Sequence, residues 1–204
     1  MCEGNVTDVH VIDLRTIEGD LRLLDAAATT RAASYQRATD CVRFIARRIA
    51  IKEIAPGTTW HCTTCGARDH GAPSHASISI STASCGDVFV VATGPKHLRL
   101  GVDVIAHFTE QESNVASAFA INEHERSIPT EELWLRKEAV GKALGRGITD
   151  GELDTTDGWW FSELAMPDGY RSLVASDHEV ELRGFEPLAF SLRTRRATNC
   201  ATAP

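Results

Sequence analysis

The chain has 204 residues, a formal net charge of −7 and 43% hydrophobic residues. This length allows one large domain or two halves of about 100 residues, each with a hydrophobic core. The acidic balance argues against nucleic acid as the main partner, because neutralisation of phosphates dominates that kind of binding. No apolar run approaches the ~18 residues that a membrane-spanning helix needs.

The N-terminal sequence and the cysteine content predict the compartment. Residues 1–5 carry no basic segment followed by an apolar one, so we expect no signal peptide. Six cysteines without an export signal indicate reduced thiols and not a disulfide framework. We therefore expect a cytoplasmic protein.

The first quarter of the chain predicts a strand, a link and a helix. Residues 6–14 alternate apolar and polar side chains, which is typical of a strand, and residues 18–30 predict a helical or irregular link. We expect a helix over at least residues 41–54, with Asp40 as a candidate N-cap. Arg48 and Lys52 are interpreted as part of its solvated face. Its core-facing positions are expected to be Cys41, Val42, Ile45 and Ile49.

Residues 56–75 are predicted to form a loop that carries side chains at a metal-like spacing. Cys62 and Cys65, together with His61 or His70, look like half of a zinc site. A closed structural site normally takes four ligands, and no second C-x-x-C follows in the sequence. Zinc and a metal-free loop therefore both stay open.

The middle of the chain predicts three strands. Residues 78–92 are typical of a strand, a turn and a strand. Residues 100–104 predict a short buried strand that carries one carboxylate, Asp103, in an otherwise apolar run. Because an unpaired buried carboxylate is costly, Asp103 needs a cation or a set of hydrogen-bond donors.

Two helices are expected next. The first covers residues 110–120, and the second begins near Thr130, a candidate N-cap, and ends before Gly145. On the second helix Glu138 and Lys142 are one turn apart and can point at the same spot. Spacing alone would make them an exposed pair worth a few tenths of a kcal/mol.

The end of the chain predicts further strands. Residues 159–161 and 169–175 indicate a closing strand pair, residues 180–192 could add a last strand, and residues 193–204 are typical of a flexible tail. Both halves of the chain then contain a strand, a helix and paired strands. We expect an α+β fold with a boundary near residue 98.

Two of these stretches resemble the motifs of one family. The buried strand carries Gly101-Val102-Asp103-Val104, and the second helix carries Trp134-Leu135-Arg136-Lys137-Glu138-Ala139-Val140-Gly141-Lys142. They are similar to the G-[VI]-D-[VI]-E strand and the W-x-x-K-E-A-x-x-K helix of the Sfp-type 4′-phosphopantetheinyl transferases, in the holo-acyl-carrier-protein synthase superfamily. Many relatives also carry a C-x-x-C-G-x-x-H-G-[KR]-P loop like the one at residues 62–73, as part of the fold.

The resemblance implies a fold and an activity. The fold is a pseudo-twofold duplication of two α/β halves, residues 1–98 and 99–192, each with a small, mostly antiparallel sheet packed on a long helix, and with the active-site cleft between the halves. The activity transfers 4′-phosphopantetheine from coenzyme A to a serine of an apo acyl or peptidyl carrier protein. It requires Mg²⁺, and a monomer is sufficient for it.

The resemblance also implies roles for particular residues. Asp103 and Glu138 would bind Mg²⁺, Glu138 or a metal-bound water would remove the serine proton, and Lys142 would stabilise charge on the transferring phosphate. A helix of the family ends in F-x-x-x-E, where either Glu123 or Glu125 fits. The expected contacts to coenzyme A come from Arg31, Arg43, Ser81, Thr82 and Lys137.

At three positions the chain departs from the family pattern. Ala72 replaces a basic residue, Thr82 or Ser84 stands where the family has a histidine, and Ile105 replaces the second acidic residue of the strand. An alternative is therefore a diverged member that keeps the coenzyme A or carrier-binding cleft but has lost or changed the transferase activity. A small zinc-dependent interaction module over residues 61–70 is a third alternative.

Overall fold

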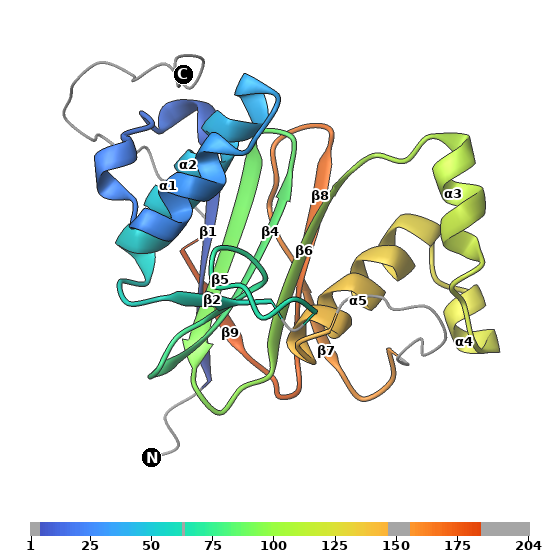
Figure 1. Cartoon of the computed structure of the whole chain (residues 1–204). Coiled ribbons are helices and arrows are strands. Elements are labelled where there is room, and N and C mark those ends of the chain that lie inside the picture. The colour runs from blue at the N-terminus through green and yellow to red at the C-terminus, as the bar shows by residue number, and fades with distance from the viewer. Residues whose placement is uncertain (1–4, 63, 147–155, 185–204) are drawn as a thin grey trace.

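The structure is a computed structural model that describes residues 5–62, 64–146 and 156–184. It is a mixed α+β protein (Figure 1). The strands are β1 Val6–Asp13, β2 Thr59–His61, β3 Ala72–Ser74, β4 Ile78–Cys85, β5 Val88–Pro95, β6 Leu100–Ala106, β7 Trp160–Glu163, β8 Tyr170–Ser176 and β9 Glu181–Arg183. The helices are α1 Ala26–Ala33, α2 Ala38–Ile54, α3 Glu110–Ser117, α4 Glu123–Arg126 and α5 Thr130–Ala143, with short 3-10 helices η1 Leu14–Thr16 and η2 Leu21–Leu23.

The described strands form three small sheets. Their orders are β4-β5-β1-β9, β6-β8-β7 and β2-β3, and every pairing is antiparallel except that of β1 with β9. The predicted strand at residues 6–14, the strand pair at residues 78–92 and the closing pair in the C-terminal half are therefore confirmed. The predicted last strand is confirmed only as the short β9, which pairs with β1 and not with its own half of the chain. Residues 185–204, including the predicted tail, lie outside the described residues.

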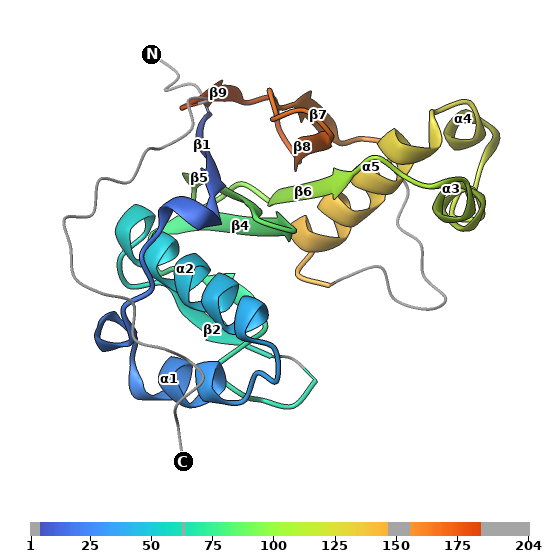
Figure 2. The same ribbon diagram turned by 90° about the horizontal axis from the view of Figure 1, so that it is seen from above.

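The two larger sheets meet where β4 lies beside β6, and each carries helices on its outer face (Figures 1 and 2). Apolar residues of β1, β4, β5, β6 and β8 fill the space between the sheets. A second cluster lies under α1 and α2, and a third lies under α5. The alternation of β6 follows from this layering: Val102 and Val104 face the other sheet, whereas Ile105 packs under α5.

Strand β6 lies directly against α5 because residue 101 has no side chain. A Cβ added to Gly101 would lie 1.8 Å from the carbonyl oxygen of Ala139, far inside contact distance. The close approach brings the next outward-facing residue of β6, Asp103, within reach of α5. The predicted end of α5 is also confirmed, because Gly145 has φ +74° and its N–H donates to the Lys142 carbonyl.

Three predictions for α2 are wrong. The helix begins at Ala38, so Asp40 lies inside the first turn and pairs with Arg37 instead of capping the helix. Val42 is 47% exposed, because the buried stripe follows Cys41, Ile45 and Ile49, and Val42 lies about 100° around the helix from Cys41. Arg48, which was expected in solvent, is only 8% exposed, because aromatic rings cover it.

Two further local predictions need correction. Thr130 is the first residue of α5 and not its N-cap, a position that Pro129 occupies. The predicted loop at residues 56–75 contains the short strands β2 and β3, which pair with His61 opposite Ala72. Among the described residues, no helix combines the length and apolar character needed to cross a membrane.

Candidate functional site

A charged pair joins β6 to the last turn of α5. Lys142 Nζ lies 2.6 Å from Asp103 Oδ1 and donates a second hydrogen bond to the Val102 carbonyl at 3.1 Å. Asp103 is only 8% exposed. The prediction that this buried carboxylate needs a cation or a set of hydrogen-bond donors is confirmed, and the partner is the cation Lys142.

Glu138 adds a second carboxylate to this pair. It lies one turn before Lys142 on α5 and is half-buried. Burial, and then the negative charge of Asp103, raise the pKa of Glu138, while the Lys142 ammonium opposes them. Burial likewise raises the pKa of Asp103 against the opposing effect of Lys142. Two carboxylates thus share one ammonium, and the cluster formed by Asp103, Glu138 and Lys142 would accept further positive charge.

Lys142 is the member of this cluster that faces open space. It lines a cavity of about 680 Å³ between the segment at residues 61–73, strand β4 and the end of α5. A second cavity of about 430 Å³ shares Gly71, Thr82 and Lys142 with the first. The basic side chains that line one or the other are Arg47, Arg48, Lys96, Arg99, Lys142 and Arg146.

Of the five residues expected to contact coenzyme A, Ser81 and Thr82 line the larger cavity. Ser81 is buried, and its Oγ accepts a hydrogen bond from the Val102 N–H at 3.0 Å. This bond ties β4 to β6 across the two sheets. Thr82 is half-buried at the junction of the two cavities.

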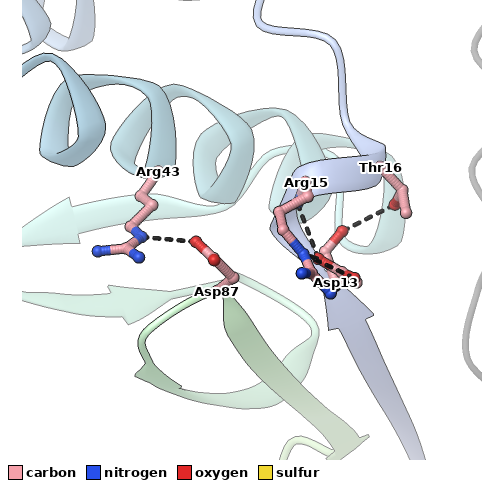
Figure 3. A network of polar contacts seen from close by, with 5 residues as sticks. All are labelled: Asp13, Arg15, Thr16, Arg43 and Asp87. Carbon is pink, nitrogen blue, oxygen red and sulfur yellow. Dashed lines mark hydrogen bonds and ion pairs between the residues drawn. The ribbon is translucent and has the colours of Figure 1, made fainter.

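The other three lie elsewhere. Lys137 is 2% exposed, and its Nζ pairs with Glu125 Oε2 at 2.8 Å inside the protein. Arg43 pairs with Asp87 at the turn between β4 and β5, at 2.7 Å (Figure 3). Arg31 lies over the ring of Tyr35, 5.6 Å from its centroid. Neither cavity is lined by any of them, and their contact with coenzyme A stays a prediction.

Arg47 and Arg48 of α2 line the second cavity, which Lys142 also lines, and sequence reasoning missed both. Arg47 Nη1 donates to Ser84 Oγ at 2.7 Å. The guanidinium of Arg48 stacks on Trp60, 3.5 Å from the ring centroid, and donates to the Asp69 carbonyl. Burial lowers the pKa of Arg48 to about 10, so it stays protonated at neutral pH. The usable signal was the spacing of Arg48 from Cys41 and Ile45, which places it on the buried stripe.

The positions that depart from the family pattern fall on two different parts of the site. Ile105 is 7% exposed and packs in the apolar cluster under α5, two residues from Asp103. Ala72 lines the larger cavity next to Gly71. Of the two candidates for the family's acidic position, Glu125 is fully buried and Glu123 is exposed, and the match of either to that position stays a prediction.

The loop between β2 and β3 brings together three side chains that the sequence offered as candidate zinc ligands. Ligand atoms of Cys62, Cys65 and His70 lie within 4.8 Å of one another. His61 is not a member of this group. Hydrogen bonds from Cys65, from its backbone N–H and its thiol, lower the pKa of Cys62 to about 7.

Comparison with known proteins adds no assignment. No protein-family model matches the chain. No curated protein matches it either.

Proposed function

We propose that the chain is a Mg²⁺-dependent 4′-phosphopantetheinyl transferase that uses coenzyme A and an apo acyl or peptidyl carrier protein. The observation that carries the proposal is the cluster of Asp103, Glu138 and Lys142, whose lysine faces a cavity lined by further cations. Phosphoryl transfer requires neutralisation of charge more than covalent catalysis, so such a site suits it.

We extend the proposal to a pseudo-twofold architecture. In residues 1–98 the chain runs β1, α2, β4, β5 and the sheet order is β4-β5-β1; in residues 99–192 it runs β6, α5, β7, β8 and the order is β7-β8-β6. Each half packs one long helix on one face of its sheet. This correspondence supports a duplication, with the cavity beside Lys142 as the proposed active-site cleft and a monomer as the functional unit.

The acidic residues fit the metal that this activity requires. Asp103 and Glu138 offer hard oxygen ligands, and the ammonium of Lys142 acts on both carboxylates. In this proposal both would hold Mg²⁺. The ion would neutralise charge on the diphosphate of coenzyme A.

The roles of the chain's own residues follow from their positions. The Lys142 ammonium can turn from Asp103 toward the cavity and bind oxygens of the transferred phosphate. The hydroxyl of Thr82 and the guanidinium of Arg47 are available to the other phosphates. Glu138, or a water held by the metal, would accept the proton of the carrier serine.

One observation favours the second candidate, a diverged protein that binds coenzyme A or a carrier without transfer. Lys142 already neutralises Asp103 at 2.6 Å, and Ile105 fills with hydrocarbon the position of the family's second acid. Such a cluster would hold an anionic ligand through Lys142 without needing a metal.

Binding and transfer measured side by side separate the two functions. Titration calorimetry would give the affinity for coenzyme A with and without Mg²⁺, and intact-mass spectrometry would detect modification of a panel of apo carriers. A transferase gains a phosphopantetheine-sized mass on a carrier serine, only with Mg²⁺. Tight, Mg²⁺-independent binding of coenzyme A with no mass gain on any carrier would instead establish the diverged function. Lys142→Ala should weaken binding in both cases, while Lys52→Ala, an exposed lysine on α2, should not.

A further inference from the structure

We propose that Cys62, Cys65 and His70 form a zinc site with three protein ligands, at the wall of the cavities. This site is separate from the cluster of Asp103, Glu138 and Lys142 and does not depend on the proposed transfer activity. Cys65 Sγ lies 3.3 Å from His70 Nε2, and the ligand atoms of all three residues lie within 4.8 Å of one another. In a tetrahedral zinc site, Zn–S and Zn–N bonds of their usual lengths put sulfur and nitrogen ligands about 3.5 Å apart. The three side chains are therefore already near the required spacing.

The loop backbone is shaped to hold the two sulfurs together. The Gly66 N–H donates to the Cys62 carbonyl at 2.8 Å, and the Cys62 N–H donates to the Ala67 carbonyl at 2.9 Å. Gly66 adopts φ +73°, which closes the turn after the C-x-x-C sequence. The turn directs the two cysteine side chains to a common point.

The same loop returns His70 to the cysteines. His61 and Ala72 are opposite each other in the β2–β3 pair, so the ladder closes the base of the loop. Gly71 has φ +98°, and a Cβ added there would lie 2.2 Å from the His61 carbonyl oxygen. Only glycine allows the chain after His70 to lie this close to the chain before Cys62.

A carboxylate orients the histidine as in known zinc sites. Asp69 Oδ1 lies 2.7 Å from His70 Nδ1, which leaves Nε2 directed at Cys65. Histidine ligands of zinc almost always donate their other ring N–H to such an acceptor. The carbonyl of Asp69 in turn accepts a hydrogen bond from Arg48, which connects the loop to α2.

The three ligands determine which metal fits the site and how many coordination positions stay open. Two thiolates and one imidazole suit zinc and not Mg²⁺, which prefers oxygen. Three protein ligands leave a fourth coordination position for water or another small ligand. Cys62 lines the larger cavity and His70 lines the smaller one, so bound zinc would fix a wall that both cavities share.

The test is zinc binding by the full chain, prepared under reducing conditions and stripped with a chelator. Competition against a chromogenic chelator should show one zinc per chain. Substitution with Co²⁺ should give the thiolate charge-transfer and visible bands of a tetrahedral site. Cys65→Ser and His70→Ala should weaken zinc binding by about 100-fold or more, and Asp69→Asn by about 10- to 100-fold. His61→Ala is the matched control, because His61 adjoins Cys62 yet lies outside the ligand group, and it should bind zinc like the wild type.

Zinc should also raise the melting temperature of the wild type and of His61→Ala but not that of Cys65→Ser. This second readout detects a variant that has simply failed to fold, because such a variant would show no cooperative transition at all. The proposal is overturned if the reduced protein takes up no stoichiometric zinc. This outcome includes the case in which Cys62 and Cys65 are isolated as a disulfide and the protein still binds no zinc after reduction. It is equally overturned if Cys65→Ser binds zinc as tightly as the wild type.

Discussion

Replacing Lys137 with methionine tests the interior ion pair that joins α5 to α4. The side chains of Lys137 and Glu125 are 1% and 0% exposed, and their charged atoms lie 2.8 Å apart. Methionine keeps the length of the side chain but removes the ammonium. Glu125 would keep its hydrogen bonds from the N–H groups of Ile121 and Thr156, at 2.9 Å and 3.0 Å, yet would carry an uncompensated buried charge.

The expected cost follows from that uncompensated charge. Removing one partner of a buried ion pair typically destabilises a protein by about 3–5 kcal/mol. Because whole domains are stable by only about 5–15 kcal/mol, the loss should be evident in urea unfolding followed by circular dichroism. The double variant Lys137→Met with Glu125→Gln should recover part of the loss, since the glutamine oxygen can still accept the backbone hydrogen bonds without a charge.

The matched control is Glu123→Gln, in the same short helix but exposed, which should leave unfolding unchanged. A loss below about 1 kcal/mol in Lys137→Met would show that the pair contributes no more than a solvated surface pair, which contradicts the prediction. The prediction would also be contradicted if the losses of unfolding free energy in the two single variants simply added in the double variant. Additivity would mean that the two side chains do not interact.

Three further predictions concern the site. Gly101→Ala should destabilise the protein by about 3 kcal/mol or more in urea unfolding, because its Cβ would meet α5 backbone, whereas Gly19→Ala, which meets only a side chain at 3.4 Å, should be tolerated. Ile105→Glu should lower the melting temperature in the absence of Mg²⁺, because it puts a carboxylate in an apolar cluster. Adding Mg²⁺ should raise the melting temperature of Ile105→Glu by more than that of the exposed control Ala106→Glu. Equal increases in the two variants would contradict a metal site there. The pKa of Glu138 is raised in the folded state, so the folded protein binds more protons and this residue's contribution to stability falls as pH rises above its ordinary carboxyl range. Unfolding free energies across pH should show that fall in the wild type relative to Glu138→Gln, and an unchanged difference would show that the pKa is not raised.

Local patterns predicted the parts of the fold that local forces decide. Alternation was enough for β1 and for the β4–β5 pair, and the cost of a lone buried charge was enough to require a cation or hydrogen-bond donors for Asp103. The spacing of Glu138 and Lys142 put both on one side of α5. In each case the structure is determined by residues a few positions apart in the sequence, or by one charged group whose burial without a partner is strongly unfavourable.

The rest depended on contacts between distant residues that no local pattern encodes. Arg48 and Arg43 carry the same charge on the same helix, but Trp60 covers the first and Asp87 pairs with the second. Lys137 lies beside Glu138 in the sequence, yet it points to Glu125 and away from the cavities. Which cation faces open space is set by tertiary packing, so the sequence indicated a helix rich in arginine but not which of its arginines line the cavity.

The most direct test of the proposed transferase is the mass of an apo carrier protein after incubation with coenzyme A, Mg²⁺ and the chain. Wild-type protein should add one phosphopantetheine group to a carrier serine, and Glu132→Gln, in the same helix as Glu138 but paired with Arg136, should do the same. Glu138→Gln should abolish the mass gain while still binding coenzyme A. Transfer by Glu138→Gln at the wild-type rate would contradict the assigned site, and no transfer by the wild type to any carrier would contradict the activity itself.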